Sequence, residues 1–121
     1  MTDARPTNIH LVFSNPPSGV SDEDFRAWYE GHLPEILSIP GFASAQLFEL
    51  EEFMANPDVA VPFRYMAAYE FEGSADDAMA GIAELRDSGG MDLPDWFDRF
   101  MSESCLISWN CLALTERLRA G

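Results

Sequence analysis

Apolar and polar residues alternate along several short stretches of the chain, which is the pattern of β-strands. In residues 8–14, Ile9, Leu11 and Phe13 alternate with a second set that includes His10, so this strand has two different faces. Three further strands are predicted over residues 42–50, 63–71 and 103–114. A loop over residues 51–62 separates the second strand from the third.

Between the first two strands, apolar residues recur every three or four positions, the spacing of an amphipathic α-helix. The helix is expected to begin near Ser21, which forms a capping-box-like pair with Asp24. His32 belongs to its apolar stripe. Because Pro34 lacks a backbone donor and crowds the preceding turn, we expect the helix to kink or restart near His32.

A second amphipathic helix is expected over residues 75–88, with Ser74 as its N-cap and Gly89-Gly90 as its end. Aromatic residues then repeat at helical spacing over residues 93–101. This short helix either extends the core or forms a lid over a ligand site. The element order is therefore βαββαβ with one inserted helix. Right-handed crossovers convert this order into a ferredoxin-like α+β fold, with a four-stranded antiparallel sheet and both main helices on one face.

The length of 121 residues fits one domain over residues 1–121, with its core at about 8–114. Hydrophobic residues make up 47% and charged residues 23%, which is ordinary globular usage. Seven basic and 21 acidic residues leave a net charge of −14, which repels nucleic acid and anionic membranes. Residues 1–7 lack an apolar signal segment, and no run is long enough for a membrane helix, so we expect a soluble cytoplasmic protein.

Both cysteines, Cys105 and Cys111, fall within the last predicted strand, on one face and roughly 20 Å apart. This separation excludes a disulfide between them within that strand. Free thiols fit a reducing compartment.

The face of the sheet without helices is apolar in either register, because Leu106 and Leu112 alternate with Ile107 and Trp109 on the last strand. An exposed apolar sheet is an aggregation hazard. Since symmetric dimers are the commonest soluble oligomers, we expect a homodimer packed sheet against sheet.

Residues 25–42 carry the most specific pattern in the chain: Phe25, Trp28-Tyr29, His32-Leu33-Pro34 and Pro40-Gly41-Phe42. Together with the element order over about residues 8–114, this pattern resembles the dimeric α+β barrel superfamily, particularly EthD-like proteins. The resemblance implies a homodimer with a pocket between sheet and helices in each protomer. The group includes lactone isomerases, polyketide cyclases and cofactor-free monooxygenases, as well as members without known chemistry.

The resemblance also implies a role for one histidine, because in isomerase-like relatives a histidine handles the proton, and His32 matches that position. Gln46-Leu47 stands where many similar proteins carry arginine, which weighs against an anionic substrate. Independently of the family, imidazole titrates near neutral pH and suits acid-base catalysis. The alternative is a structural histidine that bonds a backbone carbonyl in the core.

Six further residues are candidates for substrate binding. Trp28 and Tyr69 are expected to line the pocket, and Tyr29 and Tyr65 can donate hydrogen bonds, although such aromatics also fill cores. His10 points either into the pocket or into the dimer interface, and we favour a structural or interface role. Asn110 can orient a ligand or His10, or satisfy a neighbouring backbone group.

The sequence lacks the motifs that mark several common enzyme classes. No phosphate-binding glycine loop, dinucleotide fingerprint, nucleophile elbow or clustered Cys and His spacing is present. Two separated histidines are a weak metal signal, and haem ligation by His32 ranks below acid-base chemistry. No metal or cofactor is therefore expected.

These observations favour a small cofactor-independent enzyme that moves a proton on an apolar cyclic or aromatic metabolite, as an isomerase, cyclase or lyase. Its catalytic residue is expected to be His32. One alternative is a noncatalytic dimeric small-molecule-binding or accessory protein. Another is a cofactor-free or haem-linked monooxygenase.

Overall fold

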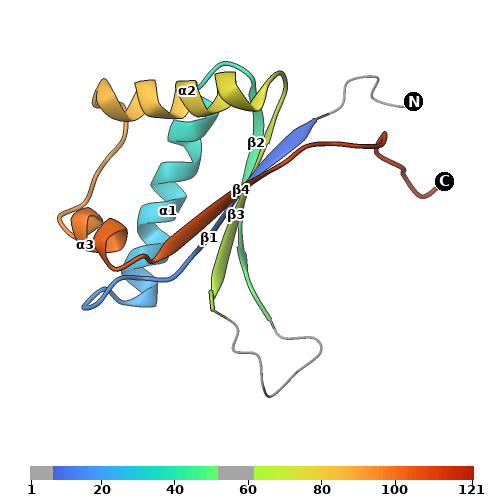
Figure 1. The fold of residues 1–121 in the computed structure, drawn as a ribbon. Helices are drawn as coiled ribbons and strands as arrows, with labels where there is room; N and C mark the ends of the chain where they lie inside the picture. Colours follow the sequence, from blue (N-terminus) through green and yellow to red (C-terminus); the bar gives the residue numbers. More distant parts are fainter. Residues whose placement is uncertain (1–6, 52–61) are drawn as a thin grey trace.

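A computed structural model describes residues 7–51 and 62–121 of the chain, and the predicted loop over residues 51–62 lies almost entirely outside them. The elements follow one another as β1 (Asn8–Ser14), α1 (Asp22–Leu37), β2 (Phe42–Glu49), β3 (Tyr65–Phe71), α2 (Ala75–Asp87), α3 (Phe97–Ser102) and β4 (Leu106–Cys111) (Figure 1). The predicted βαββαβ order with an inserted aromatic helix is confirmed.

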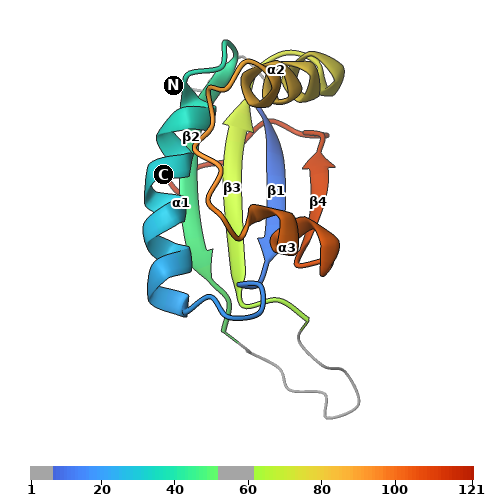
Figure 2. The same cartoon turned by 90° about the vertical axis from the view of Figure 1, so that its left-hand side faces the viewer.

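The four strands form one antiparallel sheet in the order β2-β3-β1-β4. All helices lie on the same side of this sheet, and its other face carries none of the described elements (Figure 1). Seen from the helix side, α1 runs along the β2 side, α2 crosses one end and α3 lies in front of β1 (Figure 2). The predicted ferredoxin-like α+β fold is therefore confirmed.

Helix α1 begins as expected and does not restart where expected. The Oγ atom of Ser21 accepts a hydrogen bond of 3.1 Å from the backbone N–H of Asp24, which confirms the N-cap. The helix runs unbroken through Pro34 to Leu37, so the expected restart near His32 is wrong. Glu30 and Pro34 both lie on the exposed side of α1, where water can bond the carbonyl that proline leaves without a partner.

The core lies between the helices and one face of the sheet. On β3 every second residue is buried, namely Tyr65, Ala67, Tyr69 and Phe71. Phe25, Tyr29 and Ile36 of α1 pack on this face, and Phe100 of α3 joins them. The alternation is broken on β2, where a register shift between Phe42 and Ser44 places Phe42 opposite Phe71, on the helix side.

The face of the sheet away from the helices is apolar and partly open. Trp109 is 57% exposed, Ile107 41% and Phe48 38%. Leu11 and Phe13 of β1 alternate with the buried His10 and Ser14, which places them on the same outer face. This outer sheet face, defined by Leu11, Phe13, Phe48, Ile107 and Trp109, is the surface that the sequence predicts to be covered.

The two cysteines are free, but they do not share a strand as predicted. Strand β4 begins only at Leu106, so Cys105 precedes it and is buried, whereas Cys111 at its end is exposed. The strand starts later than predicted because α3 extends to Ser102 and Ser104 adopts a left-handed backbone with a φ of 55°. The chain therefore turns at Ser104 before it can enter the sheet.

Candidate functional site

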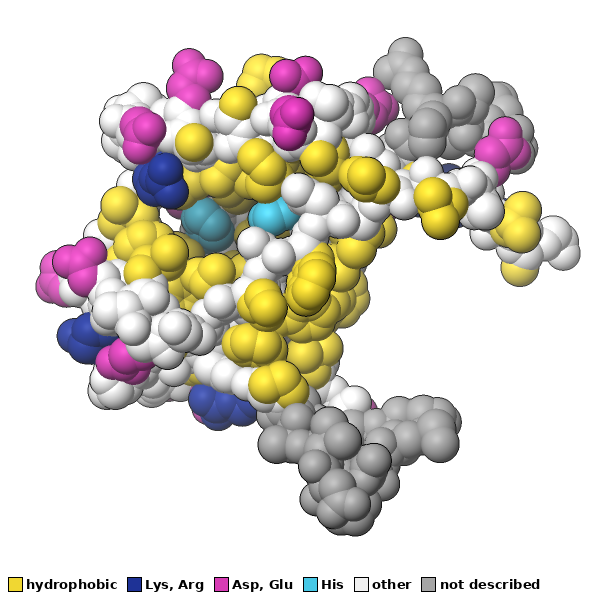
Figure 3. Space-filling view, in the orientation of Figure 1, with side chains coloured by type: hydrophobic (Ala, Val, Ile, Leu, Met, Phe, Trp, Pro, Cys, Tyr) yellow, Lys and Arg dark blue, Asp and Glu magenta, His cyan; other side chains and the backbone are white. Residues whose placement is uncertain are grey.

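A cavity of about 290 Å³ lies between the sheet and the three helices. Figure 3 shows the hollow, with both histidines of the chain visible inside it and hydrophobic side chains around them. Five of the sequence-predicted site residues line it, namely His10, Trp28, Tyr29, His32 and Tyr69. The fold thus brings together residues from α1, β1 and β3 that lie up to about sixty positions apart.

His32 is held in the cavity by an aromatic ring and a carboxylate. Its imidazole stacks on the indole of Trp28, with ring centroids 4.6 Å apart and planes inclined by 14°. Its Nδ1 atom lies 3.2 Å from Oε1 of Glu35, three residues further along the same helix face. Glu35 is therefore a site residue that the sequence prediction missed, although the i, i+3 spacing was a signal for it.

Burial of the His32 side chain, which is 14% exposed, lowers the pKa of its imidazole, and the hydrogen bond and charge of Glu35 oppose this effect without cancelling it. The neutral imidazole is therefore favoured near neutral pH. With the Nδ1 proton directed at the carboxylate, Nε2 keeps its lone pair and can accept a proton.

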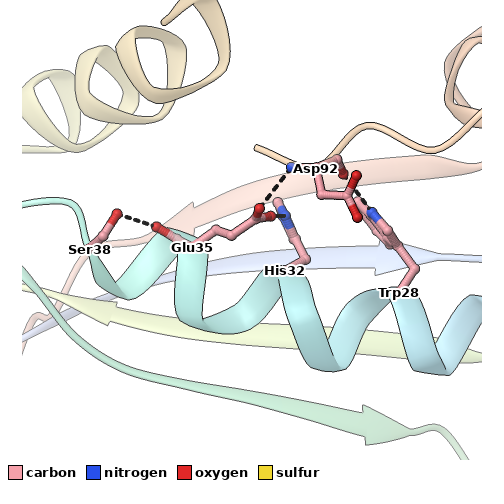
Figure 4. Close-up of polar contacts among 5 residues, drawn as sticks. All are labelled: Trp28, His32, Glu35, Ser38 and Asp92. Carbon is pink, nitrogen blue, oxygen red and sulfur yellow. Dashed lines mark hydrogen bonds and ion pairs between the residues drawn. The ribbon is translucent and has the colours of Figure 1, made fainter. Parts of the chain in front are cut away.

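The same carboxylate also fixes the chain between α2 and α3. Oε2 of Glu35 accepts a hydrogen bond of 2.7 Å from the backbone N–H of Asp92. Trp28 Nε1 donates to the carbonyl of Asp92 over 2.9 Å (Figure 4). Both backbone groups of Asp92 are thus tied to α1, one turn on either side of His32. Ser38 Oγ in turn donates to the backbone carbonyl of Glu35.

His10 occupies the opposite wall of the cavity, on β1. In the sheet it lies opposite Tyr69 of β3 on one side and opposite Asn110 of β4 on the other. The Nδ1 atom of its imidazole lies 2.8 Å from Oδ1 of Asn110. The side chain faces the cavity and not the outer sheet face, so of the structural and interface roles that the sequence favoured, its position agrees with the structural one. Burial lowers the pKa of His10, while the bond to Asn110 partly opposes the shift. Asn110 orients this histidine, one of the roles that the sequence left open.

The tyrosines divide into two groups. Tyr29 and Tyr69 line the cavity, and burial raises the pKa of both hydroxyls, so they stay protonated as hydrogen-bond donors. The Tyr29 hydroxyl lies 3.4 Å from Ser14 Oγ. Tyr65 is not among the residues at the cavity, because its hydroxyl donates instead to Asp22 Oδ1 over 3.1 Å. Its predicted role in substrate binding has no support from its position.

Helix α2 adds residues to the cavity that the sequence prediction missed. Met79 and Ile82 contribute apolar surface, and Arg86 in the last turn contributes a positive charge. Ser108 of β4 lies beside Val12 in the sheet and adds a hydroxyl. Only the placement of α2 across the end of the sheet reveals that Arg86 belongs to this site.

Residues 7–51 and 62–121 contain no group of three or more His, Cys, Asp or Glu side chains that could hold a metal ion. They also contain no helix with both the length and the apolar composition needed to cross a membrane. The expected cytoplasmic location stays a prediction.

No family model matches the sequence, and no curated protein matches it. Solved structures do match, over nearly the whole chain. A dimeric ferredoxin-like protein from an uncultured marine organism is 20% identical, with a TM-score of 0.60 over 93% of this chain and 99% of that one. A proposed monooxygenase from Shewanella loihica PV-4 is 15% identical, with a TM-score of 0.55 over 94% and 98% of the two chains.

A third match is an ethyl tert-butyl ether D (EthD) family protein from Bacillus halodurans C-125. It is 10% identical, with a TM-score of 0.50 over 90% of this chain and 99% of that one. The predicted resemblance to the dimeric α+β barrel superfamily, which includes EthD-like proteins, is thus confirmed at the level of the fold. This chain has the fold of the dimeric ferredoxin-like proteins.

Proposed function

We propose that this protein is a small cofactor-independent enzyme that transfers a proton on an apolar cyclic or aromatic metabolite. The reaction is an isomerisation, a cyclisation or an elimination. One observation carries the proposal: His32 lies in an apolar cavity with Nδ1 directed at Glu35 and Nε2 available. A positioned imidazole of this kind typically contributes 10²- to 10⁴-fold to the rate as a general base or acid.

This geometry supports the following proton transfer. Nε2 of neutral His32 takes a proton from a carbon next to a carbonyl, and the electron pair of that C–H bond moves toward the carbonyl oxygen. Glu35 stabilises the imidazolium that forms, because its carboxylate lies at Nδ1. The imidazolium then returns the proton to another carbon of the same molecule, which completes an isomerisation and restores the neutral base.

The other predicted site residues serve substrate binding in this proposal. The protonated hydroxyls of Tyr29 and Tyr69 can donate to the carbonyl oxygen on which charge develops. His10, held by Asn110, offers a second polar contact from the opposite wall. Trp28 provides an aromatic face for the ring of the substrate.

The proposal includes a homodimer formed through the outer sheet face. Three large apolar residues on that face, Phe48, Ile107 and Trp109, are more than a third exposed in the single chain. A structural neighbour is described as dimeric, which supports the same assembly here. A symmetric pair of sheets would remove these side chains from water.

A cofactor-free monooxygenase is the second candidate function. The observation that favours it is the match to a proposed monooxygenase from Shewanella loihica PV-4. In such an enzyme the same base would deprotonate the substrate before it meets oxygen. Oxygen consumption during turnover separates this reaction from an isomerisation.

The test uses a panel of lactones and of cyclic and aromatic ketones in D₂O, followed by NMR. We expect the wild-type protein to convert at least one compound, or to exchange its acidic C–H for deuterium. In His32→Asn this rate should fall by about 10²-fold or more. Glu30→Gln, on the exposed side of α1, is the matched control and should keep the full rate. Unchanged exchange in a folded His32→Asn protein would exclude His32 as the base, and binding without turnover across the panel would favour a noncatalytic ligand-binding protein.

A further inference from the structure

Arg86 is the only permanently charged side chain among the described residues that line the cavity. It lies in the last turn of α2, and the lining around it is mostly apolar or aromatic, including Met79, Ile82 and Phe97. A basic side chain borders the hollow that holds the histidines in Figure 3. The cavity therefore combines an apolar interior with one cationic group.

The guanidinium of Arg86 is nearly free to bind something else. Its Nε atom lies 3.5 Å from Oδ1 of Asp87, at the limit of a hydrogen bond, and the two side chains are 51% and 75% exposed. Ion pairs that are this exposed to water contribute little to the stability of the protein. Within residues 7–51 and 62–121, the two terminal amino groups of Arg86 make no hydrogen bond. These groups present the fork of donors that matches a carboxylate.

A cation at the C-terminal end of a helix also interacts favourably with the helix dipole, and this is the competing explanation for Arg86. That explanation requires only a position in the last turn of α2. It does not account for a side chain that lines a cavity. The two explanations differ in what they predict for ligand binding.

We propose that Arg86 binds the carboxylate of the ligand, so that the cavity takes an apolar ring compound carrying a single negative charge. This inference rests on the proposed function and names its substrate class. The ring lies among the aromatic side chains near Trp28, and the carboxylate lies at the open end beside Arg86. A single charge is favoured over a phosphate because Asp87 is close to the guanidinium and the chain carries a net charge of −14, both of which repel a dianion.

Gln46 lies outside the cavity, so the absence of an arginine at this position does not weigh against an anionic ligand. The resemblance drawn from the sequence weighed against an anionic ligand at Gln46, but Gln46 pairs with Ala68, which lies between the buried Ala67 and Tyr69. Gln46 therefore points to the outer sheet face, away from the cavity. The positive charge is supplied instead by α2.

Two probes of equal shape test the inference: 1-naphthoate and its neutral analogue 1-naphthamide. Their dissociation constants are measured by NMR titration at pH 7.5 for the wild-type protein, Arg86→Gln, Arg86→Lys and the control Arg26→Gln. Arg26 is exposed on α1 and does not line the cavity. Circular dichroism verifies that each variant is folded.

We expect the wild-type protein to bind naphthoate about tenfold more tightly than naphthamide, the value typical of a charge-assisted hydrogen bond. Arg86→Gln should abolish this preference without changing the affinity for naphthamide. Arg86→Lys should retain part of it, and Arg26→Gln should retain all of it.

Equal binding of the two probes by the wild-type protein, or an unchanged preference in Arg86→Gln, would overturn the carboxylate assignment and leave the proposed proton transfer standing. Failure of the wild-type protein to bind either probe would contradict both the assignment and a cavity suited to aromatic ligands. The helix-dipole explanation predicts a lower thermal stability in Arg86→Gln with the preference intact.

Discussion

The Nδ1 atom of His32 lies 3.2 Å from Oε1 of Glu35, and the second oxygen of the same carboxylate holds the backbone N–H of Asp92. One side chain of α1 therefore fixes both the imidazole and the connection between α2 and α3. A substitution at Glu35 should therefore alter both the imidazole of His32 and the position of this connection.

Replacing Glu35 with Gln should lower the pKa of His32 further. The wild-type carboxylate favours the protonated imidazole through its charge and its hydrogen bond, and the amide removes the charge. NMR titration of the imidazole Cε1 proton measures the shift. Glu30→Gln, on the exposed side of the same helix, is the control and should leave the pKa unchanged. An unaltered His32 pKa in Glu35→Gln would mean that the two side chains do not interact in solution.

The free energy of unfolding should decrease as the pH falls below about 6.5. Burial lowers the pKa of His10 and of His32 below the ordinary value of 6.5, so the unfolded chain binds protons that the folded chain does not. The contribution of the two neutral histidines to the free energy of unfolding is fully present above pH 6.5. It is lost as the pH falls toward their folded-state pKa, at up to about 1.4 kcal/mol per pH unit for each histidine.

Urea unfolding at pH 7.5 and pH 5.5 measures this loss. His32→Asn should lose less stability between the two values than the wild-type protein does, because one of the two groups no longer titrates. A wild-type protein equally stable at both values would contradict the burial of these imidazoles.

Two helical glycines should respond to alanine with opposite signs. A Cβ on Gly81 of α2 would lie 2.5 Å from Cγ2 of Ile39, so Gly81→Ala should destabilise the protein by about 1–3 kcal/mol. A Cβ on Gly31 of α1 meets nothing within 4 Å, so Gly31→Ala should stabilise it by about 0.5–1 kcal/mol. Chemical denaturation of both variants checks this. Equal effects would show that α2 does not pack closely on Ile39.

The proposed dimer should dissociate when a charge is placed on the outer sheet face. Trp109 is 57% exposed in the single chain, so Trp109→Glu should leave the protomer folded and bury an unpaired carboxylate only in the dimer. Light scattering coupled to size exclusion should give a dimer for the wild-type protein and for Trp109→Phe, and a monomer for Trp109→Glu. A wild-type monomer would refute the proposed assembly.

The features that could be predicted from the sequence are those determined by neighbouring residues. The alternation in β1 and the N-cap at Ser21 need only a few adjacent positions. The contact between Glu35 and Asp92 spans 57 positions and depends on how the chain between α2 and α3 returns over α1. The contribution of Arg86 likewise requires α2 to lie across the end of the sheet. The burial of Cys105 depends on the turn at Ser104.

The register shift between Phe42 and Ser44 has a consequence for comparing this chain with its structural neighbours. The extra residue, Ala43, lets Phe42 and Ala45 share the helix side of β2, although an odd number of positions separates them. In a relative without this residue, the two side chains on the helix side of β2 would be separated by two positions in the sequence and not by three. An alignment with a protein that lacks this residue therefore needs a one-residue gap inside β2, because otherwise residues that face the helices are matched with residues that face away from them.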